Sequence, residues 1–368
     1  MSLVTTDSPT DLTAARADLD ELLTAMVADH GSDLHLTAGS PPAVRVNGSL
    51  ERLPDRPRLM PSDTDLLVRS ILSDKDWGVF DRTQELDTAY TLPGVGRFRL
   101  NVFRQRSAVG AVFRSIANHI PALSELGVPE SVERFARMQR GLVLVTGPTG
   151  SGKSTTLASL IDQINTTRAG HIVTIEDPIE FLHKHKKCLV NQREVGSDTH
   201  DFATALRHVM RQDPDIILVG ELRDLETTSV AVTAAETGHL VFATLHTQSA
   251  AQTVERLIDF YPPEQQSQIR AQIAGALQGV VTQALVPRTD GNGRVVVCEI
   301  MFATSAIRNL IREGRPHQIP SFLQSSGDLG MLSFNQHLVA RFREGAVSMN
   351  SALELAHDPN EFRRLARL

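Results

Sequence analysis

The sequence contains few cysteines and no long apolar run. Of its 368 residues only two, Cys188 and Cys298, are cysteines, which excludes a disulfide framework and a four-cysteine zinc site and indicates a reducing compartment. No apolar run approaches the roughly 20 residues that a membrane-spanning helix needs. Residues 1–30 carry acids throughout, unlike a basic and then apolar leader. We therefore expect a protein that neither spans a membrane nor is exported.

The chain has no excess of positive charge and contains few aromatic side chains. The chain has 37 basic and 43 acidic residues, a net charge of −6, and 5% aromatic residues. Proteins that bind nucleic acids rely on cationic contacts to phosphates, and those that bind single strands add aromatic stacking. The basic run at 183–187 is therefore interpreted as a solvated loop, and we expect no nucleic-acid partner.

The pattern of apolar residues predicts two domains. Residues 1–15 are small and polar and are predicted to be disordered. Residues 16–118 combine helical spacing at 19–27 with alternating strands at 33–36, 85–92 and 96–102, and predict a small α+β domain. A proline-containing linker is expected at 119–130. Residues 131–368 form the second domain, with apolar strands typical of a mainly parallel α/β sheet and more helix towards the C terminus.

A complete phosphate-binding motif, G-x-x-x-x-G-K-[ST], follows the apolar strand at 142–146 and precedes a helical segment. Glycines let backbone N–H groups surround phosphate oxygens, and a helix N-terminus favours negative charge. We expect Lys153 to contact the β- and γ-phosphates of ATP and Ser154 to bind Mg²⁺. The predicted nucleotide-binding residues are Gly147, Pro148, Thr149, Gly150, Ser151, Gly152, Lys153, Ser154 and Thr155.

Acidic side chains and a histidine end three further apolar strands. Glu221 follows the strand at 216–219 and is the candidate general base. Glu176 and Glu180 follow the strand at 171–175 and are candidate Mg²⁺ ligands, although acids at strand ends are often solvated turn residues or helix caps. His246 ends the strand at 240–245, where it is either a structural polar group or a sensor of the γ-phosphate.

Arginines alternate along the last strands of the first predicted domain. Arg97, Arg99 and Arg114 belong to this set. The ordinary interpretation is a solvated strand face. Alternatively, some of these arginines reach the triphosphate and stabilise its charge during hydrolysis, because a guanidinium is well suited to phosphate.

With these motifs in view, the chain resembles the type II/IV secretion ATPase superfamily and, within it, the type IV pilus retraction ATPases. The resemblance begins near residue 19 and rests on Gly-Ser-Asp-Leu-His-Leu at 31–36, Gly-Arg-Phe-Arg at 96–99, the phosphate-binding loop, the acidic segment 174–180, the strand ending at Glu221, the histidine segment 239–247 and Ala-Ile-Arg-Asn-Leu-Ile at 306–311. The last of these is the most specific to the retraction branch.

The resemblance implies a RecA-like P-loop ATPase domain preceded by a small α+β PAS-like domain. It also implies a homohexameric ring with ATP bound between the domains of neighbouring subunits. Carried over by motif, Glu221 is the catalytic glutamate, Glu180 and His246 belong to the acidic and histidine boxes, and Arg97, Arg99 and Arg114 match the arginines of the N-terminal domain. A cytoplasmic motor that acts on a pilus platform protein at the inner membrane is the expected function.

Several alternatives stay open at this point. Assembly ATPases of the superfamily usually carry a tetracysteine zinc insertion and a longer N-terminal region, and two distant cysteines cannot form that zinc site, which favours retraction. An accessory ATPase, or one that serves a related pilus or type II secretion system, is not separated by sequence alone. From other classes of protein, a RecA-like nucleic-acid motor and a regulatory ring that binds ATP without hydrolysing it are the competitors.

Overall fold

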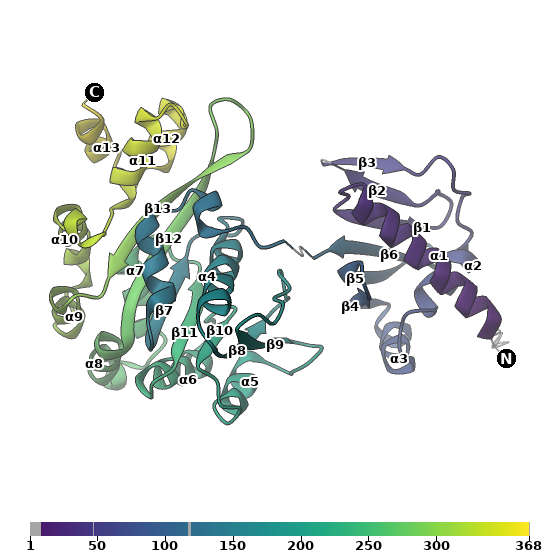
Figure 1. Cartoon of the computed structure of the whole chain (residues 1–368), viewed down its shortest axis with the longest axis horizontal. Helices are drawn as coiled ribbons and strands as arrows, with labels where there is room; N and C mark the ends of the chain where they lie inside the picture. The colour runs from purple at the N-terminus through teal and green to yellow at the C-terminus, as the bar shows by residue number, and fades with distance from the viewer. Residues whose placement is uncertain (1–8, 47, 117–118, 368) are drawn as a thin grey trace. The chain divides into compact units, whose positions relative to one another are not determined.

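A computed structural model describes residues 9–46, 48–116 and 119–367, and the chain divides into two compact units (Figure 1). Unit 1 comprises Met1–Asn118 and unit 2 comprises His119–Leu368. The division falls where the predicted linker begins. Unit 1 is an α+β unit and unit 2 an α/β unit, as predicted, while the likeness of unit 1 to a PAS domain stays a prediction.

Unit 1 is built on a six-stranded sheet with the strand order β3-β2-β1-β6-β5-β4, in which every neighbouring pair is antiparallel. Its elements are α1 (Pro9–Ala28), β1 (Asp33–Thr37), β2 (Ala43–Val46), β3 (Ser49–Arg52), α2 (Pro61–Arg69), α3 (Asp74–Thr83), β4 (Glu85–Leu92), β5 (Gly96–Gln105) and β6 (Ala108–Ser115). Strands β2 and β3 pair antiparallel, and Asn47 between them lies outside the described residues.

The alternating pattern of β5 explains how unit 1 buries its core. Phe98, Leu100 and Val102 are fully buried against residues of α1, α2 and α3, because alternate side chains of a strand face the same side of the sheet. Arg97 and Arg99 therefore project from the opposite face, and Arg99 is exposed there.

The N-terminal boundary needs a correction. Helix α1 begins at Pro9, whereas disorder was predicted through residue 15. Proline fits the first turn of a helix because the N–H groups of that turn have no partner within the helix. The prediction is therefore wrong for residues 9–15, and residues 1–8 lie outside the described residues.

Unit 2 contains a seven-stranded sheet with the order β13-β12-β7-β11-β10-β8-β9. The strands from β12 to β9 run parallel to their neighbours, and β13 pairs antiparallel with β12. The elements as far as β11 are β7 (Gly141–Thr146), α4 (Lys153–Thr167), β8 (Gly170–Glu176), β9 (Cys188–Glu194), α5 (Phe202–Val209), β10 (Ile216–Val219), α6 (Leu225–Glu236) and β11 (Leu240–Leu245). The remaining elements are α7 (Ala250–Asp259), α8 (Gln266–Ala276), β12 (Leu277–Pro287), β13 (Arg294–Phe302), α9 (Ser305–Arg312), α10 (Ile319–Ser325), α11 (Phe334–Arg343), α12 (Met349–Leu355) and α13 (Pro359–Ala366).

The strand order places the ends of β7 and β11 at a switch in the direction of the chain. From β7 the chain crosses through α4 to β8 on one side, whereas from β11 it crosses back over β7 to β12. Right-handed crossovers in opposite directions put their helices on opposite faces of the sheet. The two connecting loops therefore separate at the carboxyl ends of β7 and β11, which is where ligands bind in open α/β sheets.

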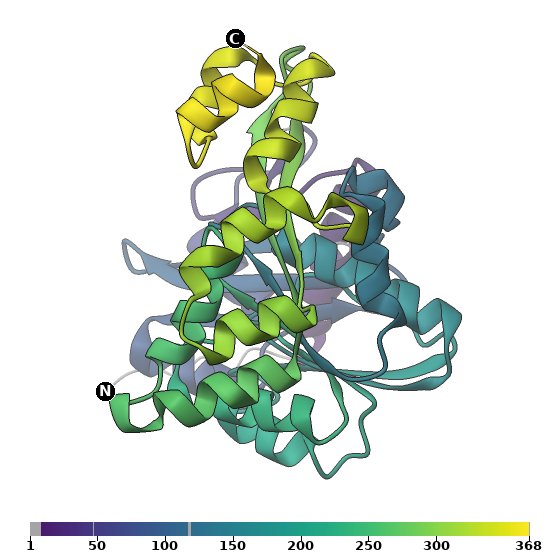
Figure 2. The same ribbon diagram turned by 90° about the vertical axis from the view of Figure 1, so that its left-hand side faces the viewer.

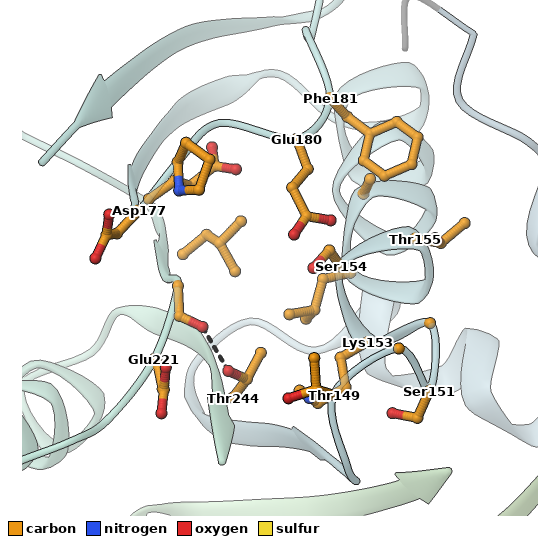
Figure 3. A pocket seen from close by; sticks show the side chains of 18 of the residues that line it. Thr149, Ser151, Lys153, Ser154, Thr155, Asp177, Glu180, Phe181, Glu221 and Thr244 are labelled. Atoms are coloured by element: carbon orange, nitrogen blue, oxygen red, sulfur yellow. Dashed lines mark hydrogen bonds between the residues drawn. The ribbon is translucent and has the colours of Figure 1, made fainter. Parts of the chain in front are cut away.

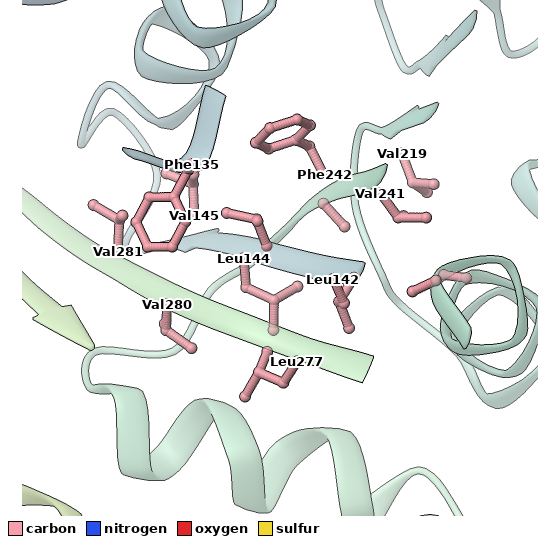
Figure 4. Close-up of a cluster of buried hydrophobic side chains, with 14 of the residues drawn as sticks. Phe135, Leu142, Leu144, Val145, Val219, Val241, Phe242, Leu277, Val280 and Val281 are labelled. Carbon is pink, nitrogen blue, oxygen red and sulfur yellow. The ribbon is translucent and has the colours of Figure 1, made fainter. Parts of the chain in front are cut away.

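The core of unit 2 lies around the central strands (Figure 4). All six residues of β7 are buried, as are all six of β11, because helices cover both faces of the sheet. Phe135 stacks on Phe302 with ring centroids 4.8 Å apart. The predicted linker is partly packed on this unit, since Leu123 is buried in its core and the Ser159 hydroxyl donates to the Pro121 carbonyl at 2.7 Å. A rigid sheet thus supports the ends of β7 and β11.

The C-terminal part contains a long hairpin that was not predicted. Strands β12 and β13 extend past the other strands, and α11, α12 and α13 lie beside the end of this hairpin (Figure 2). Phe334, Leu338 and Phe362 pack there on Val286 and Val297 in a separate small core. The predicted helices are present around the hairpin. Among the described residues, no helix is both long and apolar enough to cross a membrane.

Candidate nucleotide-binding site

The predicted phosphate-binding loop joins β7 to α4, as its motif requires. Gly152 precedes the helix with φ of 85°, a backbone conformation that side chains rarely adopt. Gly147 has φ of 140°, and a Cβ atom added to it would lie 2.2 Å from the carbonyl oxygen of Gln283. The loop therefore needs glycine at both positions, and its N–H groups lead into the N-terminus of α4.

A cleft of about 410 Å³ lies over this loop at the carboxyl ends of the central strands (Figure 3). The loop residues from Thr149 to Thr155 form its floor. Its other walls come from the acidic segment after β8 and from the ends of β10 and β11. The predicted residues that line it outside the loop are Glu176, Glu180, Glu221 and His246.

Lys153 is the first residue of α4 and is bonded to the loop itself. Its Nζ donates to the carbonyl of Gly147 at 2.9 Å and to that of Pro148 at 3.1 Å. Burial lowers the pKa of Lys153, while the carboxylates of Glu221 and Glu180 act in the opposite direction. These two acids thus favour the ammonium form of Lys153. Figure 3 also shows the side chain of Glu180 pointing towards Ser154.

Glu221 lies between two side-chain nitrogen atoms at the end of β10. Its Oε1 is 3.1 Å from Nε2 of His246, which ends β11, and its Oε2 accepts from Nε of Arg223 at 2.7 Å. Arg223 also approaches Asp177, with Nη1 3.4 Å from Oδ2. Two strand ends therefore fix the orientation of this carboxylate within the cleft, as a general base requires.

The two candidate Mg²⁺ ligands differ in their surroundings. Oε1 of Glu176 accepts from Thr174 Oγ1 at 2.6 Å and from Gln192 Nε2 at 3.1 Å. The carboxyl group is enclosed, and burial raises the pKa of Glu176 to about 7. Glu180 is exposed on the cleft side and is the more accessible of the two acids.

The donors in this cleft fit a bound Mg²⁺ ion. Mg²⁺ prefers oxygen ligands and usually combines one or two protein ligands with phosphates and water. The Ser154 hydroxyl and the carboxyl groups of Glu176 and Glu180 supply such oxygens. Among the described residues there is no group of three or more histidine, cysteine or acidic side chains that could hold a metal by itself. The Mg²⁺ assignment stays a prediction that depends on nucleotide phosphates.

The predicted arginines lie in unit 1. Arg99 of β5 and Arg114 of β6 are register partners, and Arg97 is on the same face of β5. Nε of Arg114 donates to Oδ1 of Asp33 at 2.7 Å, and Asp33 is buried. Their approach to a triphosphate stays a prediction.

Several residues that shape the cleft were assigned no role from the sequence. Arg223 follows Glu221 by two positions and forms an ion pair with it. The position of Glu221 at a strand end was the signal that a basic partner could lie nearby. Leu285 and Arg294 line the cleft from the β12–β13 hairpin, and Nη1 of Arg294 lies 3.3 Å from the carbonyl of Gly150. No local motif marked either residue, because the fold alone brings them to the loop.

Comparison with known proteins gives consistent matches. The model of the type II/IV secretion system protein family matches residues 111–329. The type IV pilus retraction ATPase PilT of Pseudomonas aeruginosa is 49% identical over 345 residues, 94% of this chain and 100% of that protein. The type IV pilus ATPase PilU of the same organism is 41% identical over 351 residues, 95% of this chain and 92% of that protein.

A solved structure is similar over almost the same length. The crystal structure of the pilus retraction motor PilT with bound ADP superposes with a TM-score of 0.88 and 48% identity. The similarity covers 94% of this chain and 98% of that one. The similarity therefore extends over residues of both units of the chain.

Proposed function

Because this chain belongs to the type II/IV secretion system protein family, we propose that it is a motor ATPase that powers the retraction of a type IV pilus. The observation that carries the proposal is the grouping in one cleft of Lys153 with the pair formed by Glu221 and His246. The full-length similarity to proteins named as pilus ATPases, one of them a retraction motor with bound ADP, supports the same function.

The loop and the start of α4 bind the phosphates. Backbone N–H groups and the helix N-terminus favour negative charge, and the ammonium group of Lys153 adds a full positive charge. Its contacts to the carbonyls of Gly147 and Pro148 keep this group beside the loop. Ser154, with Glu180 and Glu176, would hold Mg²⁺, which when bound neutralises charge on the phosphate oxygens.

Glu221 acts as the general base of hydrolysis. It takes a proton from a water molecule whose oxygen forms a bond to the γ-phosphorus, while the bond from that phosphorus to the bridging oxygen of ADP breaks. Arg223 orients one carboxylate oxygen, and Nε2 of His246 faces the other. The contact of His246 with this carboxylate supports a role for the histidine in sensing the γ-phosphate.

Force generation requires more than one subunit. We expect a homohexamer in which Arg97, Arg99 and Arg114 stabilise phosphate charge as the N-terminal unit closes over a nucleotide. The placement of these arginines on one face of the unit 1 sheet supports this role. The expected partner is a pilus platform protein of the inner membrane, with the motor at the cytoplasmic face of that membrane.

A second candidate within the same family is an accessory pilus ATPase. The 41% identity to PilU over nearly the whole chain favours keeping it. A nucleic-acid motor is not favoured, because the chain is acidic and poor in aromatic residues.

Deletion of this chain in its own host distinguishes these functions. Loss of a retraction motor should leave cells with more surface pili that no longer retract. Loss of an assembly ATPase should leave cells without pili, and loss of an accessory ATPase should only weaken retraction. An assay of ATP turnover by the purified protein, with and without single-stranded DNA, tests the nucleic-acid motor, which DNA should stimulate.

A further inference from the structure

Gln283 contacts the phosphate-binding loop from a strand that is distant in sequence. It lies in the middle of β12 and is 2% exposed. Its Nε2 donates to the backbone carbonyl of Ser151 at 2.7 Å. Gln283 is not among the described residues that line the cleft, so any effect on a bound nucleotide acts through the loop.

This hydrogen bond fixes the orientation of one peptide group in the loop. The carbonyl of Ser151 and the N–H of Gly152 belong to the same planar trans peptide and point in opposite directions. When the amide of Gln283 holds the carbonyl towards β12, the N–H of Gly152 is turned away from β12. In a loop of this motif, backbone N–H groups oriented in this way surround the phosphates.

The same residue limits the loop at its start. Its carbonyl oxygen lies so close to Gly147 that an added Cβ atom would approach it to 2.2 Å. The strand that carries Gln283 is itself fixed, because the hydroxyl groups of Thr282 and Thr146 are 2.8 Å apart and buried. Gln283 therefore contacts the loop at both ends from a rigid support.

The buried amide of Gln283 lowers the stability of the folded state, because one of its polar atoms is left without a hydrogen bond in the described part of the chain. Its Oε1 is buried and has no hydrogen-bond partner among the described residues. A buried polar atom without a partner destabilises the folded state, so an apolar side chain of similar size would pack here at a lower cost. The amide is better explained by what its N–H group does for the loop.

We propose that Gln283 is a positioning residue of the phosphate-binding loop, whose amide turns the N–H of Gly152 towards the β-phosphate of a bound nucleotide. This inference deepens the proposed ATPase function and rests on its nucleotide site. It predicts that removal of the amide weakens the binding of phosphates beyond the first, without removing any group that touches the nucleotide.

The test compares Gln283→Leu and Gln283→Glu with the matched control Gln278→Leu in the full chain. Gln278 lies on the same strand, and its Nε2 also donates to a backbone carbonyl, that of Arg140, at 3.1 Å. Dissociation constants for ADP and AMP are measured by calorimetry, KM and kcat for ATP by a turnover assay, and stability by urea unfolding.

We expect Gln283→Leu to raise the Kd for ADP and the KM for ATP by about tenfold, which corresponds to about 1.4 kcal/mol. The affinity for AMP, which has no β-phosphate, should change much less, and kcat should fall less than KM rises. Gln283→Glu should have a larger effect, because a carboxylate then faces the carbonyl of Ser151. The control should bind ADP as the wild type does.

A lower urea midpoint with the affinity for ADP within twofold of the wild type would overturn the inference, because Gln283 would then be structural only. Equal losses for AMP and ADP would also overturn it. If Gln283→Leu does not fold, Gln283→Met supplies the same comparison with an uncharged, flexible side chain of similar length. Absence of ATP turnover in the wild type would contradict the proposed function instead, while the ADP comparison would still decide the role of Gln283.

Discussion

The substitution Glu221→Gln separates catalysis from nucleotide binding at this site. In the wild type, one carboxylate oxygen accepts from Nε of Arg223 at 2.7 Å and the other lies 3.1 Å from Nε2 of His246. An amide fits this space in one orientation, with its oxygen towards Arg223, since arginine can only donate. Its NH₂ group then faces His246, whose neutral ring can accept. The shape of the site is kept while the base is lost.

The expected loss in turnover follows from the role of a general base. A positioned base contributes about 10²- to 10⁴-fold to a rate, so kcat for ATP should fall by at least about a hundredfold. Binding should change little, because the loop, Lys153 and Ser154 are unaltered. The Kd for ADP should therefore stay within about threefold of the wild type.

The assay is phosphate release under saturating ATP, with ADP binding measured on the same preparations. Glu226→Gln is the matched control, because it removes the same charge from the first turn of α6, where the carboxylate pairs with Arg207 on the surface. That variant should hydrolyse ATP at the wild-type rate. A Glu221→Gln protein that binds ADP normally and keeps kcat within tenfold of the wild type would refute Glu221 as the base.

Further predictions concern the loop lysine and unit 1. Lys153→Ala should weaken ADP binding by roughly ten- to a hundredfold, the effect of losing about 1.5 to 3 kcal/mol of charged hydrogen bonding; calorimetry that gives an unchanged Kd would remove the lysine from the site. Arg99→Ala should lower ATP turnover while the urea midpoint stays unchanged, because this side chain is exposed; an unchanged kcat would favour a merely solvated arginine. Burial acts to raise the pKa of Asp33, but hydrogen bonds from Ser32 and Arg114 outweigh it and leave this pKa below its usual value. The charged form therefore stabilises the fold above about pH 4, and this stabilisation is lost as the pH falls below that value. Asp33→Asn should lower the free energy of unfolding at pH 7 and flatten its acid dependence, whereas identical pH profiles in urea titrations would contradict this assignment.

Much of the site could be predicted because its parts are marked by local patterns. The phosphate-binding loop is a contiguous motif between a strand and a helix. Glu221 and His246 each end an apolar strand, and parallel strands bring their carboxyl ends to one edge of the sheet. Their contact at 3.1 Å depends on β10 and β11 being neighbours, which no pattern in the sequence predicted.

The contributions of the C-terminal hairpin could not be predicted in the same way. Gln283 reaches Ser151 across 132 positions of the sequence, and no periodicity relates the two. Strand β12 is buried on both faces and includes a glycine, threonine and glutamine, so it lacks the alternation of an exposed strand. The turn between β12 and β13 did carry a sequence signal, because residues 290–293 are Asp-Gly-Asn-Gly, and both glycines adopt positive φ in the structure.

The N-terminal boundary shows the limit of composition as a guide. The segment that includes Pro9 and Asp11 contains few large apolar residues, so it appeared disordered. Its proline and acid are nevertheless typical of a helix start, and α1 begins there. Packing of Leu19 and Leu23 against the sheet stabilises the later turns, and the first turns extend from them.

The central claim is that ATP hydrolysis in this cleft drives pilus retraction, and live imaging of pili tests it most directly. In host cells whose own copy is replaced by the Glu221→Gln variant, labelled pili should extend and then fail to retract, and the number of pili per cell should rise. Cells that carry Glu226→Gln should retract pili at the wild-type speed. Retraction at the wild-type speed in Glu221→Gln cells would contradict the account.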